Sequence, residues 1–474
     1  MAEPCRIIGV LEDGTHSLCA AARGHLSAAD LVIGTQRTLS LIGDCLPTHT
    51  VRRDLTGRLS EVPGWIDAAR TAAQRTVVVA TGDPLCHGIG EYLIERLGSA
   101  SCEIIPNVST IQLACARLGI PWHRMRIASV HGQDAGEWVP GAGPEHALYA
   151  LLVTLAHYER VAVLTSAHNT PDRIARLLVA EGWSTTHTLT VAERLASSQE
   201  RIVGPLSPSE AASRSFAAPN VVLLCRHVPR AHRVMFGLAD ESFAQRKPNQ
   251  GLITKREVRA VSLAYLGLRR NSIVWDIGAG SGAVGLEAAQ VCSQGHVYAA
   301  EKNAADVAIA WGNRRQCGIH NYTLLHTEAP AGLDTWPDPH GIFIGGSGGR
   351  LSEVIAYGLG RLQVGGSMVM NLVTLENLWL AITTLQTLRT PWRVTQIQVA
   401  RSHPIQHNHR FVPENPVWIL TADKDRPWSL FRQGRSSEHP FGAQAFGSRT
   451  PGAQGCVRQG CRTQADRDVF TASL

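Results

Sequence analysis

No stretch of this chain is apolar for long enough to cross a membrane. The longest strongly apolar run, residues 147–156, has about half of the roughly 20 residues that a membrane-spanning helix needs. The first residues, MAEPCRIIGV, also lack the basic segment and apolar core of a secretory signal peptide. We therefore expect a cytoplasmic protein with no membrane partner.

The sequence also lacks a CxxC cysteine pair and contains few lysines. The 11 cysteines are scattered singly without a CxxC pair, which argues against a zinc ribbon and a disulfide framework. Only four of the 45 basic residues are lysines, and no basic run marks a nucleic-acid-binding tail, so we expect no nucleic-acid partner. Arginine binds carboxylates and phosphates through paired hydrogen bonds. An acidic ligand therefore explains the excess of arginine, and a GC-rich genome explains it equally well.

The composition is otherwise globular, and the length of 474 residues allows two or three domains. In the first half, β-branched runs alternate with amphipathic stretches, which is the pattern of an α/β domain. The expected strands are 6–10, 30–34, 76–80, 102–106, 161–165 and 220–224, and the expected helices are 89–97, 111–118 and 171–181. The composition of the runs predicts buried parallel strands.

The alternation restarts after an irregular segment at about 227–250 and predicts one doubly wound α/β domain. Its expected strands are 272–276, 296–301, 322–326, 341–345, 367–371, 393–400 and 416–421, with helices at 254–266, from 282, and at 304–316, 351–361 and 374–388. Beyond residue 425 the chain is rich in Gly, Ser, Arg and Gln, which predicts disorder. We therefore expect a domain at 1–230, a linker at 231–250, a second domain at 251–424 and a disordered tail at 425–474.

The strongest chemical motif is VWDIGAGSGAVG at 274–285. It places a strand before a glycine-rich helix start, where backbone N–H groups can approach a nucleotide-like ligand. The candidate ligand-binding residues are Asp276, Gly278, Gly280, Gly282 and, further along, Glu301. This spacing also satisfies the dinucleotide fingerprint, so it does not separate NAD from S-adenosylmethionine. Asp276 favours S-adenosylmethionine, because an acid there would repel a pyrophosphate but suits the amino group of methionine.

Loops of a second kind follow the expected strands of the first half. TGDPLCHG at 81–88 forms a tight turn at the sheet edge where parallel sheets bind ligands. GVLEDG at 9–14, PNVSTIQLACARLG at 106–119 and LTSAHNTPDRIARLL at 164–178 follow other expected strands in the same way. We expect these loops to form a separate binding site.

These strings carry a resemblance to known methylases. The first half resembles tetrapyrrole methylases of the CbiE type. The strings that resemble the CbiT type are GLITKREVRA (251–260), DIGAGSGAVGLEAA (276–289), FIGGSGG (343–349) and NLVTLENL (371–378). The fusion of both, from residue 6 to about 422, resembles the CobL family of precorrin-6Y C(5,15)-methyltransferases (decarboxylating) of cobalamin biosynthesis.

The resemblance implies a tetrapyrrole methylase fold (class III methyltransferase) followed by a Rossmann-like class I methyltransferase fold. It implies one S-adenosyl-L-methionine per domain, methylation of precorrin-6B at carbons 5 and 15, and decarboxylation of the ring C acetate, which gives precorrin-8. The cofactor-binding residues that it implies are Gly9, Gly82, Asp83, Pro84, Ser109 and Thr110 in the first domain and Asp276, Gly278, Gly280 and Glu301 in the second. The sequence departs from the family at GVLEDG, where a GxGPG-like loop is usual, and at Glu328, where an aspartate is usual.

No metal or covalent nucleophile is needed for this chemistry, because the macrocycle supplies both the attacking carbon and the electron sink. The protein must mainly position the substrate and keep the acetate poorly solvated. The candidates for this catalytic role follow strands at the cofactor edge and are Gly345, Gly346, Ser347 and Asn371.

Two further patterns have simpler interpretations. The cluster of His403, His407 and His409 has no cysteine and an irregular loop setting, so we expect it to bind no metal. Thr254 and Glu257 have the spacing of a capping box and are expected to start a helix.

Two other function classes stay open. An RNA methyltransferase is one, because related folds modify ribosomal RNA and the isoelectric point is near 8.8. It would show a basic stripe with interleaved aromatics, which the sequence lacks. A nonenzymatic or NAD-linked nucleotide binder is the other, and Asp276 and the duplicated loops oppose it. We expect a precorrin substrate and a homo-oligomer.

Overall fold

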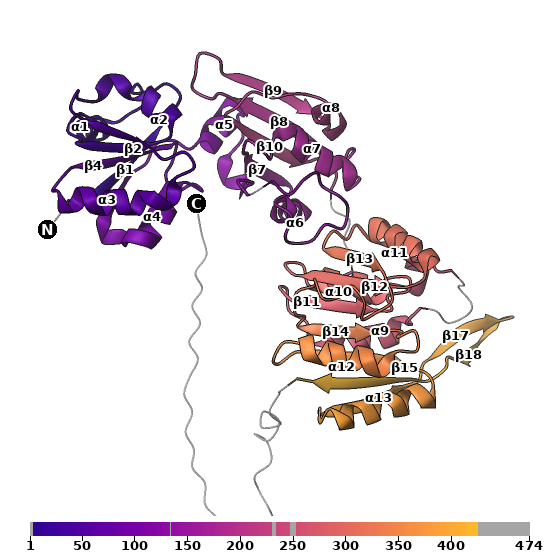
Figure 1. Cartoon of the computed structure of the whole chain (residues 1–474). Coiled ribbons are helices and arrows are strands. Elements are labelled where there is room, and N and C mark those ends of the chain that lie inside the picture. Colours follow the sequence, from indigo (N-terminus) through magenta and orange to yellow (C-terminus); the bar gives the residue numbers. More distant parts are fainter. Residues whose placement is uncertain (1–2, 133, 230–233, 247–252, 425–474) are drawn as a thin grey trace, which may run out of the picture. The chain divides into compact units, whose positions relative to one another are not determined.

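The computed structural model describes residues 3–132, 134–229, 234–246 and 253–424, so the expected tail at 425–474 lies outside the described residues. Three main sheets organise these residues (Figure 1). We refer to the part with the first two sheets as the first domain and to the part with the third as the second domain. No helix in the described ranges combines the length and apolar character needed to cross a membrane.

The first sheet is parallel and has the order β3-β2-β4-β1-β5. Its strands are β1 (Cys5–Val10), β2 (Leu31–Gly34), β3 (Val51–Asp54), β4 (Thr76–Thr81) and β5 (Cys102–Ile105). Helices cover both faces: α1 (Ala20–Ser27) and α2 (Gln36–Leu41) on one, α3 (Val62–Thr71) and α4 (Ile89–Leu97) on the other (Figure 1). The carboxyl ends of β1, β4 and β5 therefore meet at one edge.

The second sheet has the order β6-β7-β10-β8-β9 and is mostly antiparallel. Its strands are β6 (Arg126–Ser129), β7 (Arg160–Leu164), β8 (His187–Glu193), β9 (Arg201–Leu206) and β10 (Asn220–Arg226). The expectation of parallel strands throughout the first half is therefore wrong: β7 pairs in parallel with β6, whereas β10 is antiparallel to both of its neighbours.

The reason for this error is burial on both faces of the sheet. One face packs against α5 (Thr110–Leu118), and the other packs against α6 (Tyr149–His157), α7 (Pro171–Ala180) and α8 (Pro208–Ala212). Such burial gives an antiparallel strand the same β-branched composition as a parallel one.

The third sheet has the order β13-β12-β11-β14-β15-β19-β16. Five parallel strands come first: β11 (Ile273–Ile277), β12 (His296–Glu301), β13 (Tyr322–His326), β14 (Gly341–Ile344) and β15 (Ser367–Leu372). The antiparallel strands are β16 (Trp392–Ile397) and β19 (Val417–Asp423).

Helices cover both faces of this sheet, which confirms the doubly wound domain. One layer contains α9 (Arg256–Leu266), α10 (Ala283–Val291) and α11 (Ala304–Cys317), and the other contains α12 (Leu351–Arg361) and α13 (Leu375–Thr387). The strand order reverses between β11 and β14. Ligands of such sheets bind at the crevice that this reversal creates.

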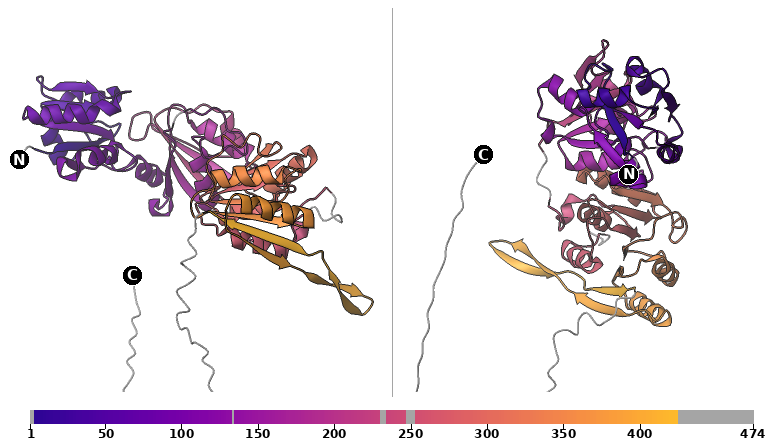
Figure 2. Two further views of the ribbon diagram at one scale, coloured as in Figure 1. Left: turned by 60° about the horizontal axis from the view of Figure 1, so that its bottom comes forward. Right: turned by 90° about the vertical axis from the view of Figure 1, so that its left-hand side faces the viewer.

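A hairpin of β17 (Ala400–Ile405) and β18 (Asn408–Pro413) projects from the second domain (Figure 2). The expected irregular loop around His403 and His409 is therefore wrong, since both residues lie in paired strands. The hairpin is mostly exposed and includes Phe411, which is 77% exposed. Without a buried face it has no alternation of apolar and polar residues by which to recognise its strands.

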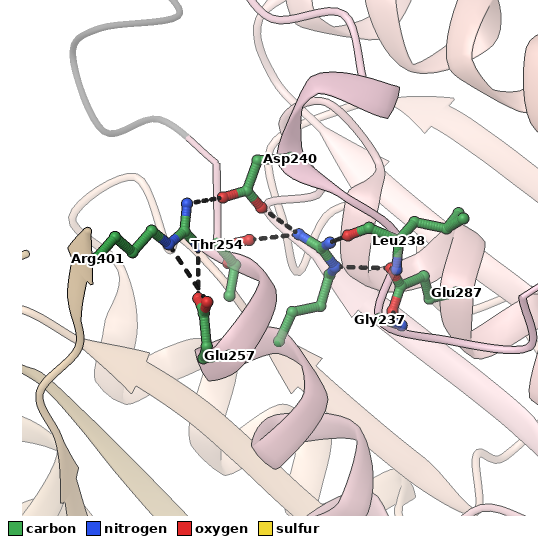
Figure 3. Close-up of polar contacts among 8 residues, drawn as sticks. Gly237, Leu238, Asp240, Thr254, Glu257, Glu287 and Arg401 are labelled. Carbon is green, nitrogen blue, oxygen red and sulfur yellow. Dashed lines mark hydrogen bonds and ion pairs between the residues drawn. The ribbon is translucent and has the colours of Figure 1, made fainter. Parts of the chain in front are cut away.

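The start of α9 also differs from expectation. Lys255 is the N-cap and makes no side-chain capping bond, so Thr254 and Glu257 form no capping box. The Glu257 carboxylate instead accepts hydrogen bonds from Arg401 of β17, and the Thr254 carbonyl oxygen accepts one from Arg259 (Figure 3). Arg401 is 144 residues away from Glu257, so no local pattern reveals this partner.

A buried ion-pair network surrounds Arg259, which has no exposed side-chain surface. Its Nε donates to Glu287 at 2.9 Å, its Nη1 to Asp240 at 3.2 Å, and its Nη2 to the carbonyl oxygen of Leu238. Glu287 is also fully buried and accepts the backbone N–H groups of Gly237 and Leu238, each at 2.8 Å. These contacts, the Arg259 network, fasten residues 237–240 onto the second domain (Figure 3).

Candidate functional sites

A cavity of about 520 Å³ lies in the first domain between residues of its two sheets. Its wall includes three of the expected cofactor residues, namely Asp83, Ser109 and Thr110. A second cavity of about 460 Å³ shares Asp83 and includes Gly9 and Asn107. The expected loops at 9–14, 81–88 and 106–119 therefore gather at the carboxyl ends of β1, β4 and β5, whereas the loop at 164–178 follows β7 of the second sheet.

Gly9 allows these loops to approach one another closely. A Cβ atom built at Gly9 would collide with the carbonyl oxygen of Gly82 and lie 2.8 Å from the backbone nitrogen of Asn107. Gly82 itself has φ of +65°, which side chains rarely adopt, and its N–H donates to the Val10 carbonyl at 2.8 Å. The role of Gly9 in the structure is thus to permit the convergence of β1, β4 and β5.

The remaining expected residues fix the shape of the same loops. The Asp83 carboxylate accepts the Leu85 N–H at 2.9 Å, and the Pro84 carbonyl accepts the Gly90 N–H at 3.0 Å. Ser109 caps α5 in a reciprocal capping box with Gln112. Thr110, the first residue of α5, follows directly in the cavity wall.

The larger cavity also contains an ion pair that no sequence pattern indicated. Glu12, in the turn after β1, pairs with Arg37 of α2, and the Arg37 Nη2 donates to the Thr81 hydroxyl at 2.8 Å. His87 and His131 line the same cavity. Glu12 and His87 lie inside the strings GVLEDG and TGDPLCHG, but only the fold shows which of their residues face the cavity.

In the second domain, two small cavities flank Glu301 at the carboxyl ends of β11 and β12. One, of about 120 Å³, is lined by Gly278, Glu301 and Gly346 among others, and one of about 160 Å³ is lined by Gly280 and Glu301 among others. One Glu301 oxygen accepts the Gly280 N–H at 2.9 Å and the other accepts the Asn303 N–H at 2.8 Å. These two hydrogen bonds fix the Glu301 carboxylate between the two small cavities.

The glycines of the motif bring two loops together at this edge. Gly278, Gly280 and Gly282 all have positive φ, and Gly282 is the N-cap of α10. A Cβ atom at Gly278 would collide with the backbone of Gly346. Side chains at Gly278 would therefore separate the motif from the FIGGSGG loop.

Asp276 lies behind the glycine loop, outside the walls of both cavities. Its side chain is 1% exposed, and its Oδ2 accepts the Gly285 N–H at 3.0 Å, whereas its Oδ1 has no hydrogen-bond partner among the described residues. Burial raises the pKa of Asp276 to about 7, and the nearby Glu301 charge adds to the rise. The Asp276 carboxylate therefore contacts the residues that follow the glycine loop and does not face an open ligand pocket.

This raised pKa predicts a pH-dependent stability. The folded pKa lies above the unfolded value near 3.8, so the stabilising contribution is complete below pH 4 and is lost as pH rises through 7. Between pH 4 and pH 8 this contribution to the unfolding free energy of the wild type should decline by on the order of 4 kcal/mol. The Asp276→Asn variant should lack this decline. Urea unfolding at several pH values measures it. Parallel wild-type and variant curves over this range would contradict the assignment.

The catalytic candidates divide between two places. Gly346 and Ser347 line the 120 Å³ cavity beyond the end of β14, next to Gly345. Asn371 lies in β15, where its Oδ1 accepts the Ser262 hydroxyl at 3.0 Å and its buried Nδ2 has no hydrogen-bond partner among the described residues. Asn371 does not line either small cavity.

Glu328 lies at the position where the sequence departs from the family. It lines the 120 Å³ cavity and pairs with Lys302 at 3.1 Å. A Cβ atom at Gly348 would lie 2.5 Å from Glu328 and 2.7 Å from Lys302, so the ion pair packs tightly against the FIGGSGG loop.

Two family descriptions match these two parts of the chain. "Tetrapyrrole (Corrin/Porphyrin) Methylases" matches residues 5–208, and "Precorrin methyltransferase domain" matches residues 247–424. The folds and their loop sites thus define a methyltransferase built from two different methylase domains. A precorrin-6Y C(5,15)-methyltransferase [decarboxylating] from Sinorhizobium sp is 31% identical over 428 residues, which cover 88% of this chain and 95% of the relative. The chain belongs to the family of precorrin-6Y C(5,15)-methyltransferases (decarboxylating).

Two further proteins are similar to parts of the chain. A cobalt-precorrin-6B C(15)-methyltransferase (decarboxylating) from Salmonella typhimurium is 35% identical over 174 residues, 36% of this chain and 90% of the relative. The crystal structure of a precorrin-6y C5,15-methyltransferase from Geobacter metallireducens is 38% identical, covers 40% of this chain and all of its own, and has a TM-score of 0.39.

Proposed function

We propose that the protein methylates precorrin-6B at carbons 5 and 15 and decarboxylates the ring C acetate, giving precorrin-8 in cobalamin biosynthesis. The single observation that carries the proposal is the presence of two separate glycine-shaped loop sites, at Gly82–Pro84 and Gly278–Gly282, in a member of this family. The family favours a tetrapyrrole substrate over RNA and over an NAD-linked ligand. We also propose that the protein is cytoplasmic, that it forms homo-oligomers, and that it binds neither nucleic acid nor membranes. The exposed Phe411 of the β17–β18 hairpin supports self-association.

S-adenosyl-L-methionine is the proposed methyl donor, with one molecule per domain. In the first domain the proposed binding residues are Gly9, Gly82, Asp83, Pro84, Ser109 and Thr110, and in the second they are Asp276, Gly278, Gly280, Gly282 and Glu301. Glu301 would accept ribose hydroxyls through the lone pairs that its two backbone hydrogen bonds leave free. Asp276 would act through the glycine loop, because its carboxylate is buried against Gly285.

The bound donor supplies a methyl group on a sulfonium, and the residues of the chain orient the acceptor carbon and exclude water from it. Gly346 and Ser347 line the cavity beside Glu301 and follow Gly345 directly, and this side-chain-poor segment suits the approach of a flat macrocycle. Asn371 stays a proposed catalytic residue near the end of β15, where substrate binding would have to expose its buried Nδ2–H₂ group, which has no hydrogen-bond partner among the described residues. The proposed domain limits are 1–230 and 251–424, with a linker at 231–250 whose residues 237–240 are fastened to the second domain by the Arg259 network.

Mass spectrometry of the reaction tests the proposal. The purified protein is incubated with precorrin-6B and a methyl-labelled donor. We expect the product to gain two labelled methyl groups and to lose one carbon dioxide. A product with unchanged mass would overturn the proposed function.

Calorimetry should detect two equivalents of S-adenosylmethionine per chain. Gly280→Val is expected to remove one of them, because Gly280 has φ of +55° and its N–H holds Glu301. Gly312→Val is the matched control, since Gly312 has open space around it on α11 and lines neither small cavity. A single equivalent in the wild type, or loss of both in the folded Gly280→Val variant, would show the two-site assignment to be wrong.

A further inference from the structure

The Glu12–Arg37 pair occupies an unusual position for an ion pair. Both residues line the 520 Å³ cavity, whose wall also contains many apolar side chains, such as Leu55, Val79 and Ile89. Arg37 comes from α2, Glu12 from the turn after β1, and Thr81 from the end of β4. A charged group in such a wall needs a partner, because desolvation of an isolated charge is costly.

Local structure does not account for the place of Arg37. It lies in the first turn of α2, where the helix dipole disfavours a cation. The helix is already capped by Thr35, whose side chain accepts the Thr38 N–H. The Arg37 side chain is 39% exposed and the Glu12 side chain 16% exposed, so Arg37 is the more exposed member of the pair, although its Nη1, which faces Glu12, is buried.

The cavity offers little other positive charge. Among the described residues that line it, Arg37 is the sole arginine or lysine. Glu12 and Asp83 are its carboxylates, and His87 and His131 are its imidazoles. A ligand that carries carboxylates would therefore be drawn to Arg37.

We propose that Arg37 binds a side-chain carboxylate of the precorrin during methylation in the first domain, and that Glu12 holds the guanidinium until this carboxylate replaces it. The inference rests on the proposed function, which supplies a substrate rich in acetate and propionate groups. Exchange of one carboxylate for another keeps the guanidinium paired throughout, so no buried charge is left without a partner.

The position of Thr81 connects this contact to the methyl-transfer site. Its hydroxyl accepts from Arg37 at 2.8 Å, and the next residues are Gly82, Asp83 and Pro84 of the proposed cofactor loop. A carboxylate held by Arg37 would thus fix the macrocycle at the edge of that loop. Arg37 is a substrate-binding residue in this arrangement, and the remaining guanidinium contact with Thr81 sets its orientation.

The test compares Arg37→Gln with Arg75→Gln in the full-length protein. Arg75 pairs with Asp30 in the same domain but does not line the cavity. We expect Arg37→Gln to raise the KM for precorrin in the methylation at carbon 5 by about 10- to 100-fold, the range for a lost hydrogen bond to a charged group. The affinity for S-adenosylmethionine and the methylation at carbon 15 should stay within about twofold, as should every property of Arg75→Gln.

Two further measurements separate binding from a structural role. Glu12→Gln removes the competing charge and should lower the same KM. A precorrin whose carboxylates are converted to amides should bind the wild type more weakly, but should bind Arg37→Gln no more weakly than unmodified precorrin does. Equal sensitivity of both proteins to amidation, or an unchanged KM in Arg37→Gln, would overturn the inference.

Failure of the proposed function gives a different result. In that case the wild type adds no methyl group to precorrin, whatever residue stands at position 37. If Arg37→Gln does not fold, Arg37→Lys keeps the charge in the cavity but not the paired donors of the guanidinium. Arg37→Lys should then give a raised KM with a normal melting temperature, and a wild-type KM in that variant would overturn the inference.

Discussion

Arg259→Met is expected to lower the unfolding free energy of the second domain by about 3–5 kcal/mol, the cost of breaking a buried ion pair by removing one partner. The reason is that Glu287 is fully buried and Asp240 is 6% exposed, and both lose a charged partner. The Leu238 and Thr254 carbonyl oxygens lose their donors as well. Urea unfolding followed by tryptophan fluorescence measures the change, because Trp275 is buried in the core of this domain.

Arg401→Met is the matched control for this prediction. Arg401 binds the same Asp240, but its side chain is 29% exposed and its other partner, Glu257, is 42% exposed. The expected loss is at most about 1 kcal/mol, as for other solvent-accessible ion pairs. Equal losses in the two variants, or a loss below about 1 kcal/mol for Arg259→Met, would contradict the importance of burial.

The parts of the fold that follow from local sequence were predictable. The expected strand at 296–301 and the expected helix at 351–361 coincide with β12 and α12. β12 is buried along its whole length, whereas α12 alternates buried and exposed residues as an amphipathic helix does, and neither pattern needs knowledge of distant partners. The glycine loops themselves were predictable for the same reason, since a strand, a glycine turn and a helix start are adjacent in the sequence, whereas their role in binding a cofactor stays a prediction.

The parts that depend on distant residues were not predictable. Strand direction in the second sheet depends on which neighbours β10 finds, and β10 has the composition of either kind of strand. Glu257 binds Arg401 across 144 residues instead of capping its own helix. The burial of Asp276 depends on the packing of α10 against β11, which the motif itself does not show.

A fragment of residues 234–424 is expected to methylate carbon 15 of its precorrin and to release carbon dioxide without the first domain. The ring C acetate adjoins that carbon, so one pocket at the end of β11 and β14 can hold both reacting groups. A fragment that starts at residue 245 should fail to fold stably. It keeps Arg259 and Glu287 but lacks Asp240, the Leu238 carbonyl and the N–H groups of Gly237 and Leu238, which the buried charges require.

Circular dichroism melting and mass spectrometry of both fragments measure these results. Arg259→Met/Glu287→Met in the shorter fragment is the informative control, because replacing both buried charges by apolar groups removes the need for the missing partners. This double variant should recover a cooperative melting transition. Two results would overturn the assignment. One is a stable 245–424 fragment with native charges. The other is a folded 234–424 fragment that methylates its substrate but retains every carboxylate until residues 1–230 are added.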